Sequence, residues 1–185
     1  MTYSGTYETS HPVCSVLLRA SIIITNYNYG RYLSRAIDSA LGQTYPNTEV
    51  IVVDDGSTDG SRGIIAEYGD RIDAILKENG GQASAFNAGL KKSTGQAVCF
   101  LDADDTLLPR ALESAVGLAV EPGVAKVHWP LWLEDSEGRR LGGLYPTEML
   151  SEGDLRDQVI RSGHEGYTRS VTSGNIWSRA FLEFV

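Results

Sequence analysis

The chain has 185 residues, of which 42% are hydrophobic and 22% charged, the ordinary range for a soluble α/β domain with a core of its own. Its 24 acidic and 16 basic residues give a formal net charge of -8, which opposes attraction to a phosphate backbone, so we expect no nucleic acid partner. Cys14 and Cys99 are its two cysteines and form neither a disulfide framework nor a CxxC metal site.

The start of the chain shows no targeting or membrane signal. Residues 1–11 are rich in Ser, Thr and Tyr without periodicity, and we treat residues 1–20 as a flexible leader. The apolar stretch 16–24 contains Arg19 and Ser21 and is too short to span a bilayer. We expect no transmembrane segment and a cytoplasmic location, with peripheral association at the inner face of the membrane left open.

From Ser21 onward, short runs of Ile and Val alternate with segments of helical period. This pattern is typical of βα units on a parallel sheet. We expect strands at 21–25, 49–53, 74–76 and 97–101, and helices that end near Gly42 or cover 61–68, 83–92 and 109–120. The sequence therefore predicts an α/β fold, with a Rossmann-like, mostly parallel sheet flanked by helices, whose first subdomain covers residues 21–120.

After Val120 the pattern changes. Residues 127–133 and 141–144 favour two partner strands around a turn at 135–138, Leu155, Val159 and Ile160 favour a helix, and Ser178 is placed to cap a terminal helix. We expect residues 121–185 to begin an acceptor-side subdomain that is truncated at the chain end.

The first polar cluster is Thr25, Asn26 and Tyr27, at the end of the first expected strand. Side chains there face the crevice at the carboxyl edge of a parallel sheet, where ligands bind in open α/β folds. The tyrosine can stack on a nucleobase, and the other two side chains offer hydrogen bonds. A simple turn would also explain this cluster.

Asp54 and Asp55 follow the second expected strand, so two carboxylates stand at its tip. One of them can accept a hydrogen bond from the imide N–H of uracil or thymine, and Gly56 lets the backbone turn closely around a ligand. Ser57 or Asp59 is expected to cap the next helix, a structural role that does not account for the two carboxylates before them.

A glycine-rich segment, residues 79–89, leads into the third expected helix and includes Gly81 and Gln82. Glycines before a helix expose N–H groups that suit phosphate or ribose oxygens, although such a pair is often only a tight turn. Its place after the third strand favours the binding of phosphate or ribose.

The last cluster, Asp102, Ala103, Asp104 and Asp105, follows the apolar strand 97–101. In extended backbone, residues two apart point the same way, so Asp102 and Asp104 can converge. Carboxylates this close favour a bound cation, and Mg2+ or Mn2+ suits oxygen ligands and a diphosphate. A turn that caps the following helix would explain only Asp105.

Taken in order, these four clusters resemble those of glycosyltransferase family 2, and Ser173-Gly174-Asn175 is similar to the family's acceptor-side loop. The resemblance implies the GT-A fold and metal-dependent, inverting transfer from a UDP- or dTDP-sugar to an acceptor hydroxyl, as in the synthesis of cell envelope polysaccharides. The acceptor class, whether saccharide, lipid-linked or protein, is left open. By analogy, Thr25 and Tyr27 contact the base, Asp55 its imide edge, Asp102 the ribose or metal, and Asp104 the metal.

Two departures from the family pattern limit the analogy. Phe86 stands where the family commonly has Arg, and the later acidic motif that supplies the general base is not found before Val185. We expect that base beyond Val185, with His164 and Glu165 as the nearest substitutes, and expect this chain alone to bind donor but transfer poorly. A noncatalytic nucleotide-sugar or carbohydrate-binding module with the same fold is the alternative function.

Two other enzyme classes fit less well. A sugar nucleotidylyltransferase would place a basic, glycine-rich loop after the first strand, where this chain has Asn26-Tyr27-Asn28-Tyr29. A HAD-type phosphatase would place its nucleophilic aspartate there, where this chain has Thr25.

Overall fold

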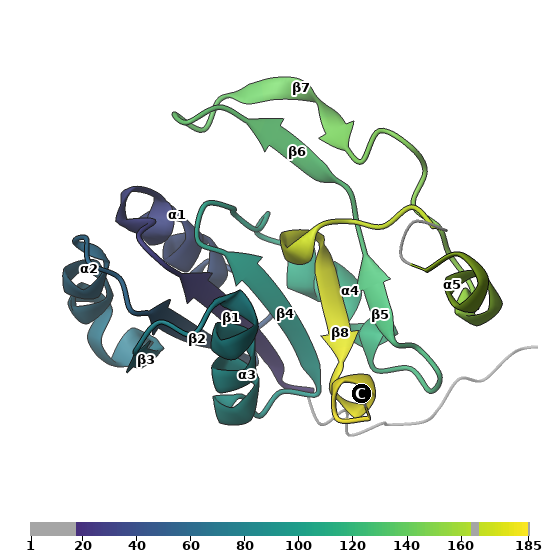
Figure 1. Ribbon diagram of the computed structural model, residues 1–185, viewed down its shortest axis with the longest axis horizontal. Coiled ribbons are helices and arrows are strands. Elements are labelled where there is room, and N and C mark those ends of the chain that lie inside the picture. The colour runs from purple at the N-terminus through teal and green to yellow at the C-terminus, as the bar shows by residue number, and fades with distance from the viewer. Residues whose placement is uncertain (1–17, 164–166, 185) are drawn as a thin grey trace, which may run out of the picture.

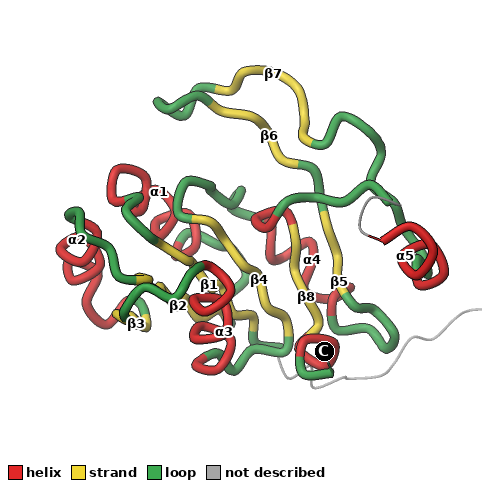
Figure 2. Tube along the Cα trace, viewed as in Figure 1, coloured by secondary structure: helices red, strands yellow, loops and turns green. Residues whose placement is uncertain are grey.

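The computed structural model describes residues 18–163 and 167–184, which form a central sheet with helices on both faces (Figures 1 and 2). Most of the predicted leader, residues 1–17, lies outside the described residues. Six strands form the sheet in the order β3-β2-β1-β4-β8-β5, and a separate two-stranded sheet pairs β6 with β7. The predicted α/β fold with a mostly parallel sheet is confirmed.

The first four strands are parallel and lie within a residue or two of their predicted bounds, because their dense Ile and Val content marks them locally. β1 is Ala20–Asn26, β2 Thr48–Asp55, β3 Asp73–Lys77 and β4 Ala97–Asp102. The second strand is longer than predicted at its carboxyl end, so that Asp54 and Asp55 are the last residues of β2 rather than the loop after it.

The helices between these strands are also close to prediction. They are α1 (Gly30–Leu41), α2 (Ser61–Tyr68), which runs into the short 3-10 helix η1 (Gly69–Arg71), α3 (Gln82–Lys92) and α4 (Ala111–Ala119). The fourth helix begins two residues later than predicted, because Pro109 lies in the preceding turn, where its carbonyl accepts a hydrogen bond from the N–H of Thr44.

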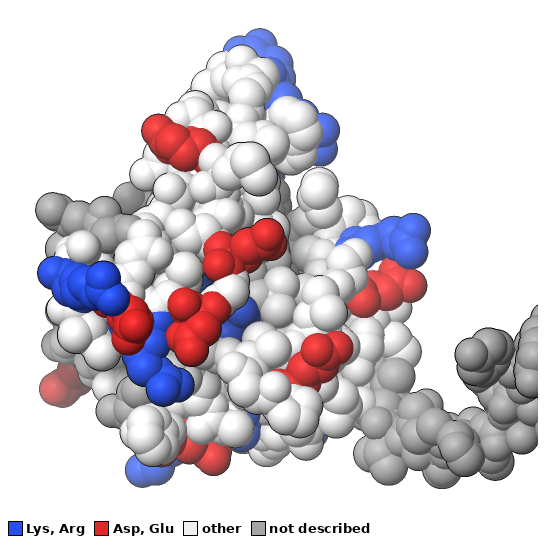
Figure 3. Space-filling model, turned by 90° about the vertical axis from the view of Figure 1, so that its right-hand side faces the viewer, with Lys and Arg blue, Asp and Glu red and all other residues white. Residues whose placement is uncertain are grey.

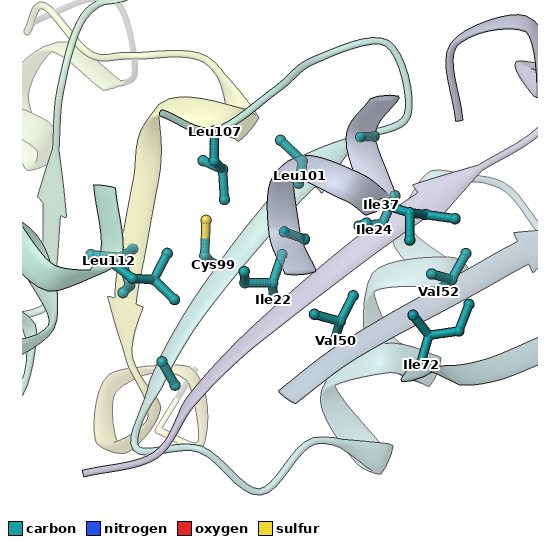
Figure 4. Packing of buried hydrophobic residues seen from close by; sticks show 14 of the residues in the cluster. Ile22, Ile24, Ile37, Val50, Val52, Ile72, Cys99, Leu101, Leu107 and Leu112 are labelled. Atoms are coloured by element: carbon teal, nitrogen blue, oxygen red, sulfur yellow. The ribbon is translucent and has the colours of Figure 1, made fainter. Parts of the chain in front are cut away.

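Alternate residues of the buried strands face two apolar layers. Ile22, Ile24, Val50 and Val52 face the layer that contains α1, α2 and α4 (Figure 4), whereas Ile23, Ile51 and Val53 face α3. Because successive side chains of a strand point to opposite faces, this alternation also decides the direction of the polar residues at the strand ends.

The second part of the chain differs from prediction in two places. Residues 127–133 do not form one strand: β5 (Lys126–His128) and β6 (Leu131–Glu134) are separate, because Pro130 between them has no N–H to donate to a ladder. The strand β8 (Asn175–Ser178) was not predicted. It lies antiparallel between β4 and β5 and is preceded by a 3-10 helix, η3 (Thr172–Gly174).

The remaining elements follow the predicted order. β7 (Arg140–Tyr145) pairs with β6 around the predicted turn, where the N–H of Gly138 donates to the carbonyl of Asp135 at 2.9 Å. The helix α5 (Arg156–Ser162) is present, and Ser178 precedes α6 (Arg179–Leu182), although its side chain makes no capping hydrogen bond. The boundary at residue 120 stays a prediction, since β5 and β8 share the sheet of the first four strands.

The hairpin formed by β6 and β7 projects from the body of the molecule, at the top of Figure 1. All six residues of β7 are exposed. No helix among the described residues is both long and apolar enough to cross a membrane.

Candidate functional site

The candidate site lies at the carboxyl edge of β1 and β4. The chain runs outward from β1 through β2 to β3, then returns to place β4 on the other side of β1. In doubly wound sheets this reversal opens a crevice outside the strand ends, and ligands bind there. Thr25 on β1 is the direct neighbour of Asp102 on β4, so the first and last polar clusters meet at this crevice.

A cavity of about 310 Å³ occupies this crevice. Nine of the ten residues predicted to bind the donor line it, from four separate segments of the chain: Thr25, Asn26, Tyr27, Asp55, Gly81, Gln82, Asp102, Ala103 and Asp104. Tyr27 and Tyr29 are both about half exposed, so each offers ring surface to a ligand.

Asp54 is the exception, because the structure does not place it where the predicted contact with a donor in this cavity would form. It shares the α1 and α2 side of the sheet with Val52, is fully buried, and does not line the cavity. Its carboxylate accepts hydrogen bonds from Asn26 Nδ2 at 3.0 Å and from Arg62 Nε at 2.8 Å. Burial alone would raise the pKa of Asp54, but these bonds, with those from Ser57, lower it, so the group is a buried anion with a structural role.

Asp55 points to the opposite side of the sheet and reaches the cavity, where it organises the glycine-rich loop. Its carboxylate forms a short ion pair with Lys77 and accepts hydrogen bonds from the N–H groups of Gly80 at 3.0 Å and Gly81 at 2.7 Å. These contacts lower its pKa although burial opposes them. Asp55 therefore already binds these two N–H groups. This differs from the prediction that the glycines of this loop expose N–H groups for phosphate or ribose oxygens.

Gly56 also has a different role from the one predicted. Its φ is +83°, and a Cβ at this position would lie 2.6 Å from the backbone nitrogen of Asn79. The glycine thus permits close approach of the chain itself, between the end of β2 and the glycine-rich loop, rather than of a ligand.

The loop after β1 is fixed to the loop after β2 by Asn28. Its side-chain oxygen accepts hydrogen bonds from the N–H of Thr58 at 2.7 Å and of Asp59 at 3.3 Å, and its own N–H donates to Ser57 Oγ at 2.9 Å. Asp59 accepts a hydrogen bond from the N–H of Ser61 at 2.9 Å, but the N-cap residue of α2 is Gly60, so neither Ser57 nor Asp59 caps this helix as predicted. These bonds hold the segment that carries Tyr27 and Tyr29.

The acidic cluster after β4 has the perturbed electrostatics expected of crowded carboxylates. Burial, followed by the charges of Asp105 and Asp104, raises the pKa of Asp102 to about 6. Gln82 Nε2 donates to Asp102 Oδ1 at 3.0 Å and favours the ionised form. Burial also raises the pKa of Asp105, with a further contribution from Asp104. A nearby cation would relieve this repulsion.

The cavity suits a divalent cation that is completed by its ligand. None of the described residues lining it is Lys or Arg, so no lining side chain there neutralises a diphosphate. The described residues hold no group of three His, Cys, Asp or Glu placed to bind a metal. Mg2+ and Mn2+ commonly bind to one or two carboxylates and take the remaining ligands from substrate phosphates and water, so Asp102 and Asp104 fit such an ion.

Several residues at the site were not predicted as ligand contacts. Tyr29, Asn79 and Ala85 also line the cavity. Ser173 Oγ accepts a hydrogen bond from the N–H of Asp102 at 3.0 Å, because the antiparallel β8 brings its preceding turn to the carboxyl edge of β4. The sequence signal for Ser173 was its similarity to the family's acceptor-side loop, but the contact with Asp102 depends on the unpredicted strand.

The structure describes Phe86 but not the two candidate bases. Phe86, where the family commonly has Arg, packs against Phe100 with ring centroids 4.8 Å apart and belongs to the apolar layer under α3. His164 and Glu165 lie outside the described residues. The general base expected beyond Val185 stays a prediction.

Charges of both signs are interspersed on the face of the molecule shown in Figure 3, and neither sign covers that face continuously.

Comparison with known proteins shows the family and the fold of the chain. An uncharacterized glycosyltransferase of Nostoc sp. is 38% identical over 172 residues, which cover 91% of this chain and 53% of that protein. The crystal structure of Staphylococcus aureus TarS 1-349 in complex with UDP-GlcNAc matches 90% of this chain and 47% of that one, with a TM-score of 0.61 and 22% identity, and shows the fold alone.

A second structure is a mannosyltransferase from Pyrobaculum calidifontis in complex with GDP-Man and Mn2+, with a TM-score of 0.61, 25% identity, and coverage of 90% of this chain and 46% of that one. The chain thus spans about half the length of these relatives. The predicted GT-A fold is confirmed. The model for glycosyl transferase family 2 matches residues 21–170, so the chain belongs to this family.

Proposed function

We propose that this chain is the donor-binding domain of an enzyme that transfers a sugar from a UDP- or dTDP-sugar to an acceptor hydroxyl, with Mn2+ or Mg2+ and with inversion at the anomeric carbon. One observation carries the proposal: the cavity between β1 and β4 combines exposed tyrosine rings and the Asp102–Asp104 pair, and no Lys or Arg is found among its described lining residues.

The lining of the cavity offers groups for both parts of a nucleoside diphosphate. Tyr27 and Tyr29 provide ring faces for a base, and Asp55 offers a carboxylate that can accept an imide N–H. Asp102 and Asp104 would hold the cation, which when bound supplies positive charge to the diphosphate leaving group. The bond between Gln82 and Asp102 orients one of these carboxylates before any ligand arrives.

Calorimetry with UDP can test the proposal. We expect UDP to bind in the presence of Mn2+, and expect EDTA or Asp104→Ala to weaken binding by at least about tenfold, the scale of one lost charge-assisted interaction. Asp70→Ala is the control, because Asp70 lies in η1 and does not line the cavity. UDP affinity unchanged by both EDTA and Asp104→Ala would refute the metal site.

The same measurement with dTDP, CDP and GDP tests the base. GDP deserves inclusion because the mannosyltransferase relative was solved with GDP-Man. A preference for UDP or dTDP over CDP would support the role given to Asp55, whereas a preference for GDP would reject a pyrimidine donor.

We further propose that this chain by itself binds the donor but transfers its sugar poorly, because we find no general base among its described residues. General-base assistance contributes on the order of 10²- to 10⁴-fold, so its loss suppresses transfer far more than donor affinity. Comparing this chain with one extended to the length of its relatives, for donor affinity and for transfer, would decide this. Equal and efficient transfer by both would contradict it.

Nucleotide binding without any transfer by the longer chain would instead favour the alternative of a noncatalytic binding module. The cytoplasmic location, peripheral association with the inner membrane face and a role in cell envelope polysaccharide synthesis are proposed from family resemblance. Fractionation of the native protein would test the first two.

A further inference from the structure

A second cavity, of about 640 Å³, lies beside the donor cavity and shares Asp104 with it. Its walls are α1, the segment 104–108, α4, the end of β5 and the β6–β7 hairpin. A molecule in this cavity would thus lie next to the carboxylates proposed to hold the donor diphosphate. This shared carboxylate is the first reason to expect a second substrate here.

The hairpin contributes an aromatic platform to this cavity. Trp132 is 44% exposed, and the Arg140 guanidinium lies over its ring, 5.1 Å from the centroid. This contact steadies the indole, since a guanidinium over an aromatic face is attracted by the ring quadrupole. Trp129, by contrast, packs against the core and is anchored by its N–H bond to Gly174. Of the two tryptophans, Trp132 is therefore the one whose ring is available to a ligand.

The hairpin is held over the cavity by Arg35 of α1. Arg35 Nη2 pairs with Glu134 Oε2 at 3.0 Å, and a Cβ at Gly138 would lie 2.5 Å from the same guanidinium. Because both contacts come from residues in or beside the turn of the hairpin, they set the position of its tip. The tether keeps Trp132 on the wall of the cavity.

The charges of the cavity point to an uncharged ligand. Its lining contains the carboxylates Asp104, Asp105, Glu134 and Asp135, which outnumber the three arginines. Arg35 is paired with Glu134, Arg110 with Glu113 and Asp135 with Arg139, so Asp104 and Asp105 are the lining carboxylates without an ion pair among the described residues. An anionic ligand would meet the charge of Asp104 and Asp105, and an isoprenoid chain would cover these two carboxylates without offering them a hydrogen bond, which is costly.

We propose that this second cavity binds an uncharged saccharide as the acceptor, with one pyranose ring against Trp132. A pyranose has an apolar C–H face that suits an indole and a rim of hydroxyl groups that can bond to carboxylates and guanidinium groups. The role of this saccharide as the acceptor rests on the proposed function. The binding of a saccharide in the cavity does not depend on that function.

Saturation-transfer NMR with cellobiose and N,N′-diacetylchitobiose tests the site. We expect at least one of these neutral disaccharides to bind in the millimolar range, and expect Trp132→Ala to weaken it about tenfold, as truncation of an aromatic anchor typically does. Leu141→Ala is the matched control, since Leu141 is on the same hairpin, is 64% exposed and does not line the cavity.

Three outcomes would overturn the proposal: neither disaccharide binds, binding is unchanged by Trp132→Ala, or the control variant loses as much as Trp132→Ala. Farnesyl phosphate and glucuronic acid serve as the lipid and anionic probes. Trp132-dependent binding of either one in preference to the neutral disaccharides would also overturn it.

Calorimetry with UDP and Mn2+ on the same variants separates this proposal from the preceding one. We expect Trp132→Ala to leave UDP affinity unchanged, because Trp132 does not line the donor cavity. Disaccharide binding without UDP binding would reject the proposed function but retain the saccharide site. UDP binding without disaccharide binding would retain the proposed function but reject the saccharide site.

Discussion

The donor edge of the sheet and the β6–β7 hairpin are held in place very differently. At the donor edge, hydrogen bonds join the strand ends and loops: Asn26 to Asp54 is buried, Asp55 to Gly81 is partly buried and Asn28 to Thr58 is exposed. The hairpin is largely exposed, and the ion pair that joins it to the body, Arg35 with Glu134, lies between partly exposed side chains. An isolated two-stranded hairpin is only marginally stable in water.

Because of this difference, the two regions suit different kinds of ligand. A loop edge that is hydrogen-bonded before the ligand arrives loses little conformational freedom on binding, which suits recognition of one fixed group such as a nucleotide. A weakly held hairpin opens at low cost in free energy and can adjust to a larger ligand. Substitutions at the two regions should therefore separate effects on global stability from effects on local opening.

The largest expected effect is at Gly89, where α3 crosses β1. A Cβ there would lie 2.3 Å from Ile23 Cγ2, so Gly89→Ala should lower the free energy of unfolding by about 3 kcal/mol through overpacking. Gly117→Ala in α4 is the control, because nothing lies within 4 Å of that Cβ, and it should stabilise by about 0.5–1 kcal/mol. Urea denaturation measures both; equal effects of the two would show that the close approach of α3 does not matter.

Glu49, at the opposite end of β2 from the donor edge, should have the next largest effect. Its carboxylate accepts hydrogen bonds from Ser21 Oγ and the N–H of Thr94, both at 2.6 Å, and pairs with Arg19. Glu49→Gln should cost about 2 kcal/mol of unfolding free energy, because it breaks bonds to a buried charge. Asp157→Asn, at an exposed pair on α5, should leave the melting temperature unchanged.

The Glu49 contribution should also depend on pH. Burial alone would raise the pKa of Glu49, but the bonds from Ser21 and Thr94 and the charge of Arg19 lower it below its ordinary value of 4.5. A lowered folded-state pKa means that the stabilisation is complete above about pH 4.5 and is lost as the pH falls through the folded-state pKa. Urea titrations between pH 7 and pH 3 should show a smaller loss of stability in Glu49→Gln; parallel curves would disprove the linkage.

At the donor edge itself, Asp55 should affect binding more than Asp54. Asp55→Asn should weaken UDP about tenfold and CDP less, since cytosine lacks the imide N–H and one lost charged hydrogen bond is worth about 1.5 kcal/mol. Asp54→Asn should lower the melting temperature with little selectivity between nucleotides, because Asp54 does not line the cavity. Equal losses of UDP and CDP with Asp55→Asn would assign Asp55 only to positioning the glycine-rich loop.

The smallest global effect is expected for Arg35→Gln. The ion pair with Glu134 is partly exposed, and pairs of this kind contribute between about 0 and 1 kcal/mol. We expect an unchanged melting temperature but faster amide hydrogen exchange across residues 131–145, with Arg161→Gln in α5 as the control. Undiminished protection of the hairpin in Arg35→Gln would show that other contacts hold it.

The positions of the first four strands and their helices could be read from the sequence because the signals are local. Runs such as Ile22-Ile23-Ile24 and Val50-Ile51-Val52-Val53 mark buried strands, and the apolar stripe of α1 marks the face that packs on them. With the parallel topology, strand ends must meet at one edge, so the candidate site could be predicted as a set of residues from four segments.

Tertiary structure decided the roles within that set. Both faces of β2 are apolar, so the sequence did not distinguish Asp54 from Asp55; α1 and α2 cover one carboxylate, and the cavity reaches the other. The short β8 has too few residues to show a period of two, and it forms a strand because the edge of β4 is available to it. The contact of Ser173 with Asp102, and the cavity beneath Trp132, depend on pairing between distant segments, which no local pattern records.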